Sequence, residues 1–183
     1  MLGILNALGA ECRLEGERLS ISAASLSAAE IPETLAGQMR SSVMLLGPLL
    51  ARLGRVETSL PGGCRIGKRP VDLHIRGLTE LGAVVRIEDN RIRAEAPPAG
   101  LLGAEIHLPY PSVGATENIL MAAAGARGET VLVGAAREPE IGILCSFLKA
   151  MGVSVEGAGS SVIRVRGTGS FRDSRFSLPG DRI

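Results

Sequence analysis

The sequence predicts a mixed α/β fold made of a repeated helix–strand–helix–strand–strand unit, with the helices inside and the sheets outside. The first observation is a helix stop that recurs at nearly equal spacings, at Gly9, Gly82 and Gly152. A period of roughly 70 residues indicates one supersecondary unit used several times. The second is that two short alternating runs, typical of a hairpin, follow each stop. The third is residues 112–126, which are apolar or small on most of their surface, as a buried helix is.

The first unit opens with a predicted helix over Met1–Leu8, because its apolar residues fall on one helical face and Gly9 follows. Two alternating runs, 10–14 and 18–23, flank Glu15 and Gly16 and predict a hairpin.

The second unit opens with a long predicted helix over Pro32–Leu53, kinked at the Gly47–Pro48 pair and closed by Gly54. The elements expected after it are a strand over 55–60, a helix over Val71–Leu81, and a hairpin with strands 83–87 and 91–96.

The third unit has the same order of elements, preceded by a brief strand. Its expected elements are a strand over 106–108, a helix over Ser112–Ala126, a strand over 130–133, a helix over Glu140–Met151, and a hairpin with strands 153–156 and 162–166. Residues 171–183 have no clear periodicity. We therefore expect a single domain over 1–167 and a linker over 168–183 that leads towards a second domain absent from this chain.

The count of helices is one short of three complete units. Five helices are predicted where three units need six, so we expect that the first helix–strand half is missing before Met1. On this interpretation the chain is most of one domain.

One stretch carries the chemistry, the segment from Pro61 to Pro70. Three glycines and two prolines make it a loop, and it places Cys64 among Arg65, Lys68 and Arg69. Neighbouring cations favour a reactive thiolate, and cations beside a glycine loop can hold an anion. The helix that follows would point its N-terminal donors at the loop. The alternative is a basic surface loop with an inert cysteine.

Composition narrows the class of protein. The net charge is +1 and there are only four aromatic residues, so neither a nucleic-acid surface nor a base-stacking platform is expected. No apolar stretch approaches the roughly 18–20 residues that span a bilayer, so no membrane partner is expected. An odd set of cysteines (Cys12, Cys64 and Cys145) fits a reducing cytoplasm and predicts neither a disulfide framework nor a metal site. No cofactor is expected.

Four segments carry a family resemblance: LPGGCRIGKRPVDLH, GLTELGA, PSVGATENILMAAAGARGETVL and AAREPEI. Together they resemble the UDP-N-acetylglucosamine enolpyruvyl transferases, over nearly the whole chain. The related 5-enolpyruvylshikimate-3-phosphate synthases share the fold but lack the cysteine loop. The resemblance implies an inside-out α/β barrel-like domain of βαβαββ units. It also implies transfer of the enolpyruvyl group of phosphoenolpyruvate to the 3-hydroxyl of UDP-N-acetylglucosamine, the first committed step of peptidoglycan synthesis.

The resemblance also assigns roles in the cysteine loop and just after it. It implies that Cys64 donates a proton to the methylene carbon of phosphoenolpyruvate, can add to it covalently, and is the residue that fosfomycin alkylates. Arg69 matches an arginine that contacts the substrates, and Lys68, with Arg65, would give electrostatic help only. The residues that match the segment gripping the uridine are Pro70, Val71, Asp72 and Leu73.

Outside the loop, Arg40 matches an arginine of the sugar-nucleotide site. Ser112, Val113 and Gly114 match a nucleotide-binding segment, and Ser112 is independently a good helix N-cap that suits a diphosphate. His74 is either a proton relay or a helix histidine bonded within the structure.

Other residues near these motifs are predicted to be structural or to lack a role. The turn from Arg137 to Glu140 reads as a helix entry with acids at its positive end. Tyr110 stands where some relatives carry lysine. The family's Lys–Asn pair for phosphoenolpyruvate and its aspartate base have no counterpart in this chain.

Three functional hypotheses remain open. The chain is an incomplete piece of an enolpyruvyl transferase, without turnover alone; or a non-catalytic module that binds the sugar nucleotide; or a purely structural fragment. In the last case it would self-associate through the apolar seam left by the missing helix.

Overall fold

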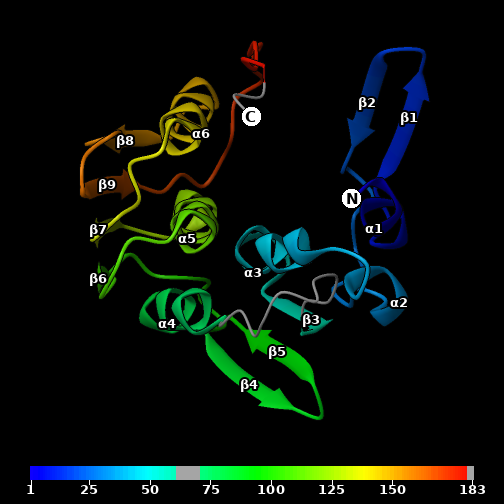
Figure 1. The fold of residues 1–183 in the computed structure, drawn as a ribbon, viewed down its shortest axis with the longest axis horizontal. Helices are drawn as coiled ribbons and strands as arrows, with labels where there is room; N and C mark the ends of the chain where they lie inside the picture. The colour runs from blue at the N-terminus through cyan, green and yellow to red at the C-terminus, as the bar shows by residue number, and fades with distance from the viewer. Residues whose placement is uncertain (61–70, 181–183) are drawn as a thin grey trace.

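The computed structural model describes residues 1–60 and 71–180, which form a mixed α/β fold (Figure 1). Its helices are α1 Leu2–Ala7, α2 Glu33–Ala36, the 3-10 helix η1 Arg40–Leu45, α3 Leu46–Leu53, α4 Asp72–Glu80, α5 Val113–Gly125 and α6 Pro139–Ala150. Its strands are β1 Glu11–Glu15, β2 Arg18–Ser22, β3 Arg55–Ser59, β4 Val84–Glu88, β5 Arg91–Glu95, β6 Glu105–His107, β7 Glu129–Val133, β8 Ser154–Glu156 and β9 Val162–Arg166.

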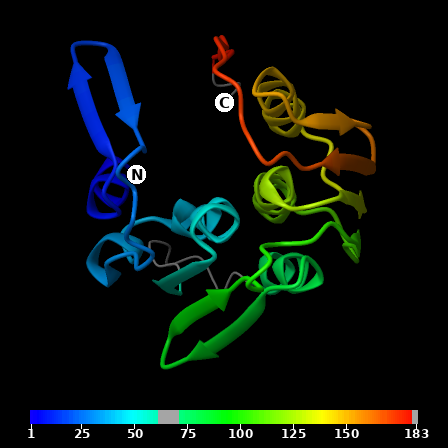
Figure 2. The ribbon, with the colours of Figure 1, turned by 180° about the vertical axis from the view of Figure 1, so that it is seen from behind.

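The strands of the described residues form three separate sheets. β1 and β2 make a hairpin by themselves, the second sheet has the order β3-β5-β4, and the third has the order β6-β7-β9-β8. Among the described strands, only β6 and β7 run parallel within a sheet, and the other neighbours are antiparallel. Figures 1 and 2 show α3, α4, α5 and α6 gathered together, with the second and third sheets outside them and the β1–β2 hairpin standing apart.

The helix stops predicted at three glycines are confirmed, and they share one geometry. Gly9, Gly82 and Gly152 have φ values of 95°, 93° and 95°, the left-handed region that favours glycine. In each case the next residue donates its N–H to a carbonyl five residues back, as Ala83 does to Leu78, and the glycine donates to the carbonyl three residues back. This is the Schellman pattern of helix termination, so the recurring sequence pattern corresponds to a recurring backbone turn.

The prediction of one continuous helix over Pro32–Leu53 is wrong. The segment is divided into α2, η1 and α3, because Met39 is extended (φ −145°, ψ 140°) and separates the first turn of helix from the rest. Pro48 lies in the first turn of α3, where a backbone N–H has no partner within the helix. The Gly47–Pro48 pair therefore opens a helix, and it does not kink one.

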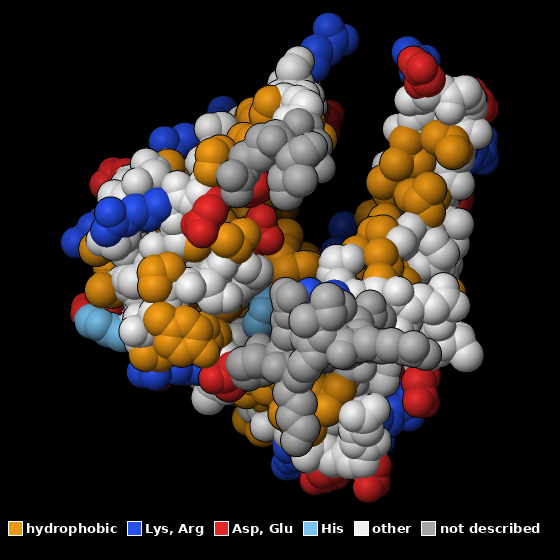
Figure 3. Space-filling view, viewed as in Figure 1, with side chains coloured by type: hydrophobic (Ala, Val, Ile, Leu, Met, Phe, Trp, Pro, Cys, Tyr) orange, Lys and Arg blue, Asp and Glu red, His pale blue; other side chains and the backbone are white. Residues whose placement is uncertain are grey.

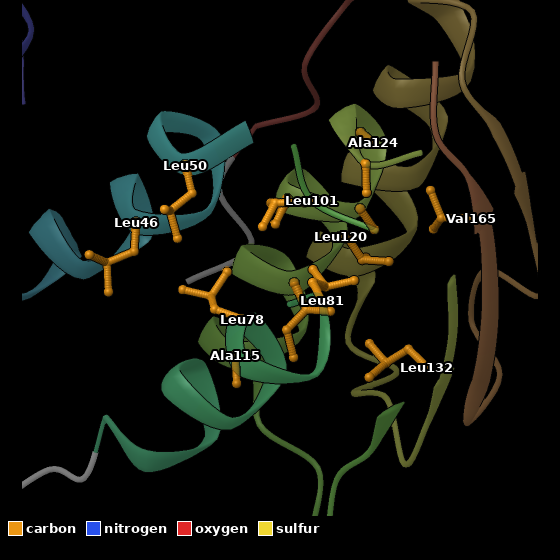
Figure 4. Close-up of a cluster of buried hydrophobic side chains, with 14 of the residues drawn as sticks. Leu46, Leu50, Leu78, Leu81, Leu101, Ala115, Leu120, Ala124, Leu132 and Val165 are labelled. Atoms are coloured by element: carbon orange, nitrogen blue, oxygen red, sulfur yellow. The ribbon is translucent and has the colours of Figure 1, made fainter. Parts of the chain in front are cut away.

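The core is aliphatic, as the near absence of aromatic residues predicts. Figure 4 shows side chains from several elements meeting in it, including Leu50 of α3, Leu78 of α4, Leu120 of α5 and Val165 of β9, all of which are 1% exposed or less. Helix α5 is in contact with α3, α4 and α6 and is buried along most of its length. It is the central helix of the molecule.

Glycines allow the helices to approach α5 closely. A methyl group at Gly77 of α4 would overlap the Ile119 side chain, and one at Gly125 of α5 would lie 2.9 Å from the Ala51 Cβ of α3. Close backbone packing thus replaces large side chains at these crossings.

The segment after β9 has neither helix nor strand up to residue 180. It still packs on the domain: Arg172 donates its backbone N–H to the Met151 carbonyl at 2.8 Å, and the Phe176 and Phe147 rings lie 5.4 Å apart. In the described part of the chain, no helix has the length and apolar character needed to cross a membrane.

Candidate functional site

The candidate site is assembled around the entrances of two helices, α4 and α5. Cys64, Lys68, Arg69 and Pro70, with Arg65, lie outside the described residues. The flanks of their loop are described: β3 ends at Ser59 and α4 begins at Asp72.

The residues after the loop divide into exposed and buried ones. Asp72 is exposed in the first turn of α4, where its carboxylate suits the positive end of the helix dipole. Leu73 is 5% exposed and belongs to the hydrophobic core, so only its backbone can face a ligand. Val71 is half-buried and caps the helix without a side-chain bond.

The entrance of α5 has free backbone donors. Ser112 is the N-cap, as predicted, and its Oγ accepts a hydrogen bond from the Ala115 N–H at 3.4 Å. The N–H groups of Val113 and Gly114 have no acceptor in the described ranges 1–60 and 71–180. Free N–H groups at a helix N-terminus attract anions, so this end of α5 can receive one.

The two helix entrances meet at His74 and Gly114. A Cβ placed on Gly114 would lie 3.4 Å from His74 Cε1, 3.5 Å from His74 Nε2 and 3.7 Å from the Met44 sulfur. These are ordinary van der Waals distances, so the backbone of Gly114 lies directly beside the imidazole without crowding it. The structure thus brings together two predicted site segments that are far apart in sequence.

A buried asparagine, Asn118 of α5, ties this junction to α3 and η1. Its Oδ1 accepts the backbone N–H of Gly47 at 2.7 Å, and its Nδ2 donates to the carbonyl of Val43 at 3.2 Å. Nδ2 also lies 3.0 Å from His74 Nδ1. Asn118 is fully buried, and this network satisfies both ends of its amide.

The network determines the tautomer of His74. The Gly47 N–H can only donate, so the atom facing it is the oxygen of Asn118, and the amide nitrogen must face His74. His74 Nδ1 is therefore the acceptor, and the proton lies on Nε2, at the edge next to Gly114. Burial lowers the pKa of His74 from 6.5 to about 4, against the weaker opposing effect of Asp72, so the ring is neutral at pH 7.

These facts bear on the two interpretations of His74. It is bonded within the structure, as one of them predicted, and it presents a neutral N–H donor at the junction. The junction of α4 and α5 thus offers hydrogen-bond donors, which suit a polar anionic ligand.

Arg40 is exposed at the first residue of η1 and forms no ion pair within the described residues.

Sequence reasoning missed Asn118 and Glu117. The available signal was a polar pair, Glu117 and Asn118, directly before an apolar run in a helix predicted to be buried. Burial raises the pKa of Glu117, and the nearby carboxylate of Glu140 raises it further. Glu140 lies in the first turn of α6, next to the N-cap Glu138, which confirms the predicted helix entry with acids.

Tyr110 is 50% exposed just before the entrance of α5. Among the described residues, no cluster of histidine, cysteine, aspartate and glutamate could hold a metal ion.

A family model matches the chain over its full length. The model described as EPSP synthase (3-phosphoshikimate 1-carboxyvinyltransferase) matches residues 1–183. The chain belongs to this family.

Curated relatives within the family share one name. A protein of Rhodospirillum centenum named UDP-N-acetylglucosamine 1-carboxyvinyltransferase is 52% identical over 169 residues, which are 92% of this chain and 39% of that protein. A protein of Finegoldia magna with the same name is 46% identical over 184 residues, covering 100% of this chain and 43% of the relative. The chain thus spans about two fifths of the length of these relatives.

Solved structures agree on the fold. The enolpyruvyl transferase NikO of Streptomyces tendae superposes with a TM-score of 0.75 at 23% identity, over 91% of this chain and 39% of that one. EPSP synthase of Acinetobacter baumannii superposes with a TM-score of 0.67 at 21% identity, over 93% of this chain and 39% of that one. At these identities the likeness concerns the fold alone.

Proposed function

We propose that this chain is part of a UDP-N-acetylglucosamine 1-carboxyvinyltransferase. The reaction joins the enolpyruvyl group of phosphoenolpyruvate to the 3-hydroxyl of UDP-N-acetylglucosamine; the C–O bond to phosphate breaks and inorganic phosphate leaves. Such an enzyme works in the cytoplasm at the start of peptidoglycan synthesis.

One observation carries the proposal: eight curated relatives, all with this name, are 45–52% identical over 92–100% of the chain. The site geometry is compatible with it. Both substrates are anionic, and the free N–H groups of α5, the Nε2–H of His74 and the unpaired Arg40 suit anionic groups.

In this proposal the sugar nucleotide contacts Arg40, Arg69, the residues from Pro70 to Leu73, and the entrance of α5 from Ser112 to Gly114. Cys64 donates the proton to the phosphoenolpyruvate methylene carbon, and Lys68 adds positive charge. His74 serves as a neutral hydrogen-bond donor, because a pKa of about 4 leaves it with no charge to offer at pH 7. No residue of this chain is assigned the role of base for the acceptor hydroxyl. No residue is assigned the role of anchor for phosphoenolpyruvate.

We extend the proposal to the domain organisation of the chain. Residues 1–167 would form the cysteine-loop domain, an inside-out barrel-like arrangement of three units, and residues 168–183 would lead to a second domain.

Binding to the 183-residue chain tests the proposal. Calorimetric titration with UDP-N-acetylglucosamine should show binding that Ser112→Ala weakens, while shikimate 3-phosphate should give no heat. Turnover, followed as phosphate release with both substrates present, should be undetectable for this chain alone. Binding of shikimate 3-phosphate without UDP-N-acetylglucosamine would overturn the substrate assignment.

The cysteine is tested separately. Fosfomycin should add to the chain in the presence of UDP-N-acetylglucosamine, and intact-mass measurement should show that Cys64→Ser abolishes the adduct. Labelling that persists in the Cys64→Ser chain would remove Cys64 from the proposal.

A binding module without catalysis is the second candidate, favoured by the small share of the relatives that the chain covers. It predicts nucleotide binding by this chain, and no turnover when the remaining portion of a full-length relative is added. Absence of binding to either ligand would leave the purely structural hypothesis.

A further inference from the structure

The ring of His74 lies along one turn of helix α5, with its two nitrogens at different levels of that helix. Nδ1 lies 3.0 Å from Asn118 Nδ2, and the Nε2 edge lies beside Gly114, one turn nearer the N-terminus of α5. Residues four apart in a helix stand on the same face, one turn apart. The Nε2–H of the neutral ring is therefore at the N-terminal end of α5.

This N–H is a buried donor without an acceptor. His74 is 8% exposed, and within residues 1–60 and 71–180 the hydrogen bond of its ring is the one at Nδ1. Leaving a buried donor unpaired is costly, so the arrangement points to a ligand that accepts from it. The N–H groups of Val113 and Gly114 are free at the same end of α5. We call these three N–H groups the donor cradle.

The chemistry of the donor cradle selects the charge state of its ligand. Ser112 Oγ already accepts a hydrogen bond from the Ala115 N–H, so its hydroxyl proton is left to donate as well. Donors satisfy only oxygen atoms that carry no proton. A fully ionised diphosphate diester or a sulfate fits such a site, whereas a phosphate that keeps a hydroxyl group leaves that hydroxyl without an acceptor.

Positive charge on the visible surface does not replace these donors. Among the described residues on the face that Figure 3 shows, lysine and arginine side chains lie apart from one another around the rim and form no continuous basic patch. Dispersed charges attract an anion without fixing its orientation. Directional hydrogen bonds fix it, so the ring nitrogen of His74 that carries the proton becomes decisive, and the bond at the other nitrogen sets which one that is.

We propose that Asn118 is a positioning residue of the nucleotide site: its amide donates to His74 Nδ1, keeps the ring proton on Nε2, and so completes the donor cradle for the fully ionised diphosphate of the sugar nucleotide. Asn118 does not touch the ligand, because it is fully buried one turn inside α5. The inference rests on the proposed function, since it takes UDP-N-acetylglucosamine as the ligand.

Few groups act on the charge of His74. Asp72 of α4 is the charged group that acts on it among the described residues, and its effect is weaker than that of burial. The other side chains around the contact of His74 with Gly114 are those of Met44 and Asn118, and both are uncharged. The ring therefore stays neutral between pH 6.5 and pH 8, and the affinity for UDP-N-acetylglucosamine should not change in that range.

Asn118→Asp tests the positioning role through a pH profile. The carboxylate keeps the bond from the Gly47 N–H, but it accepts from His74 and so draws the ring proton to Nδ1. At pH 8 the bare Nε2 then faces the anion, and the affinity for UDP-N-acetylglucosamine should fall at least about tenfold. Towards pH 6.5 the ring gains a second proton, Nε2 donates again, and the affinity should recover.

The affinities are measured by calorimetric titration at both pH values. Every chain carries Cys64→Ser, so that the thiol of the cysteine loop does not titrate. Ser42→Ala is the matched control, because Ser42 is equally buried and its hydroxyl bonds only the carbonyls of Ala36 and Met39. It should lose stability but keep the affinity and the flat pH profile of the parent. A flat profile in Asn118→Asp would overturn the proposal.

NMR of the parent chain tests the same inference should Asn118→Asp not fold. Long-range proton–nitrogen spectra should place the ring proton of His74 on Nε2. Saturation with UDP-N-acetylglucosamine should move the signals of that N–H and of the Val113 and Gly114 amides together. Binding of the nucleotide that leaves the His74 N–H signal in place would overturn the proposal.

Sulfate separates this inference from the proposed function, because it is a fully ionised anion without a nucleoside. If UDP-N-acetylglucosamine does not bind, the proposed function loses its substrate. A joint shift of the three donor signals on adding sulfate would then still support the positioning role of Asn118. No shift with either probe would overturn it.

Discussion

At the scale of single residues, Asn118 holds the junction of the candidate site in one arrangement. Its amide is the acceptor for α3 and the donor for η1 and for His74 of α4, so one side chain from α5 fixes three neighbours. Because the site is buried, each of these groups would be costly to leave without a partner.

Replacing Asn118 should therefore destabilise the chain and change His74. Asn118→Leu leaves the Gly47 N–H and the Val43 carbonyl without partners and should lower the free energy of unfolding by about 2–4 kcal/mol, measured by urea denaturation. Asn118→Asp keeps the acceptor for Gly47 but puts a carboxylate beside His74, which should raise the pKa of His74, measured by NMR titration.

The exposed Gln38→Ala serves as the control and should change neither quantity. An Asn118→Leu chain as stable as the parent would contradict the network.

The buried His74 predicts loss of stability in mild acid. The pKa of His74 is about 4 in the folded chain and near 6.5 when unfolded. Below pH 6.5 the unfolded chain therefore binds a proton that the folded chain does not, and stability falls as the pH drops towards 4. The loss should reach about 2 kcal/mol between pH 7.5 and pH 5, measured by urea denaturation at both values.

In a His74→Gln chain this part of the pH dependence should disappear. A parent and a variant with the same pH dependence would show that His74 is not the group responsible.

The sequence could predict part of the site. Ser112 was predictable because an N-cap depends on local chain chemistry, and it caps α5 as expected. The contact of His74 with Gly114 and the role of Asn118 were not, because both depend on which face of α5 meets α3 and α4. The roles of Cys64 and Arg69 stay predictions, since they lie outside the described residues.

At the scale of elements, the helices depend on close approach at glycine. Gly47 of α3 lies against Asn118: a Cβ there would be 2.6 Å from Asn118 Oδ1 and would overlap its backbone carbonyl. Backbone atoms in the middle of a packed helix cannot move away cheaply.

This predicts opposite effects for two glycine-to-alanine changes. Gly47→Ala should destabilise the chain by about 1–3 kcal/mol, because it overpacks the α3–α5 crossing. Gly142→Ala in α6, where nothing lies within 4 Å of the new methyl group, should stabilise it by up to about 1 kcal/mol through helix propensity. Thermal and urea unfolding measure both; two changes of the same sign would contradict the packing described.

Elements were predictable where local signals agree. The hairpin at Asp89 and Asn90 forms as expected, and both residues adopt positive φ, as a tight turn of this kind requires. The prediction of a long helix over Pro32–Leu53 failed because its apolar spacing continues through Met39, whereas the backbone of Met39 is extended.

At the scale of the whole molecule, burial is uneven between repeats. The inner residues of β5 and β9 are almost inaccessible, whereas the β1–β2 hairpin is covered on neither face. Stability against local opening should follow the same order, because few buried contacts hold the hairpin.

Hydrogen exchange should display this gradient. The amides of β1 and β2 should exchange at least about a hundredfold faster than those of β5 and β9, after correction for intrinsic rates, in native buffer. Equal protection in the three hairpins would mean that the chain opens as one cooperative unit.

The free edge of β2 also has a practical consequence for handling the protein. An edge strand with unpaired backbone groups and an exposed apolar face can pair with the same strand of another chain, which leads to intermolecular β-sheets and aggregation. Concentrated stocks of this chain should therefore turn cloudy on warming before the helical interior melts, and a lysine in place of Ile21 should keep them clear.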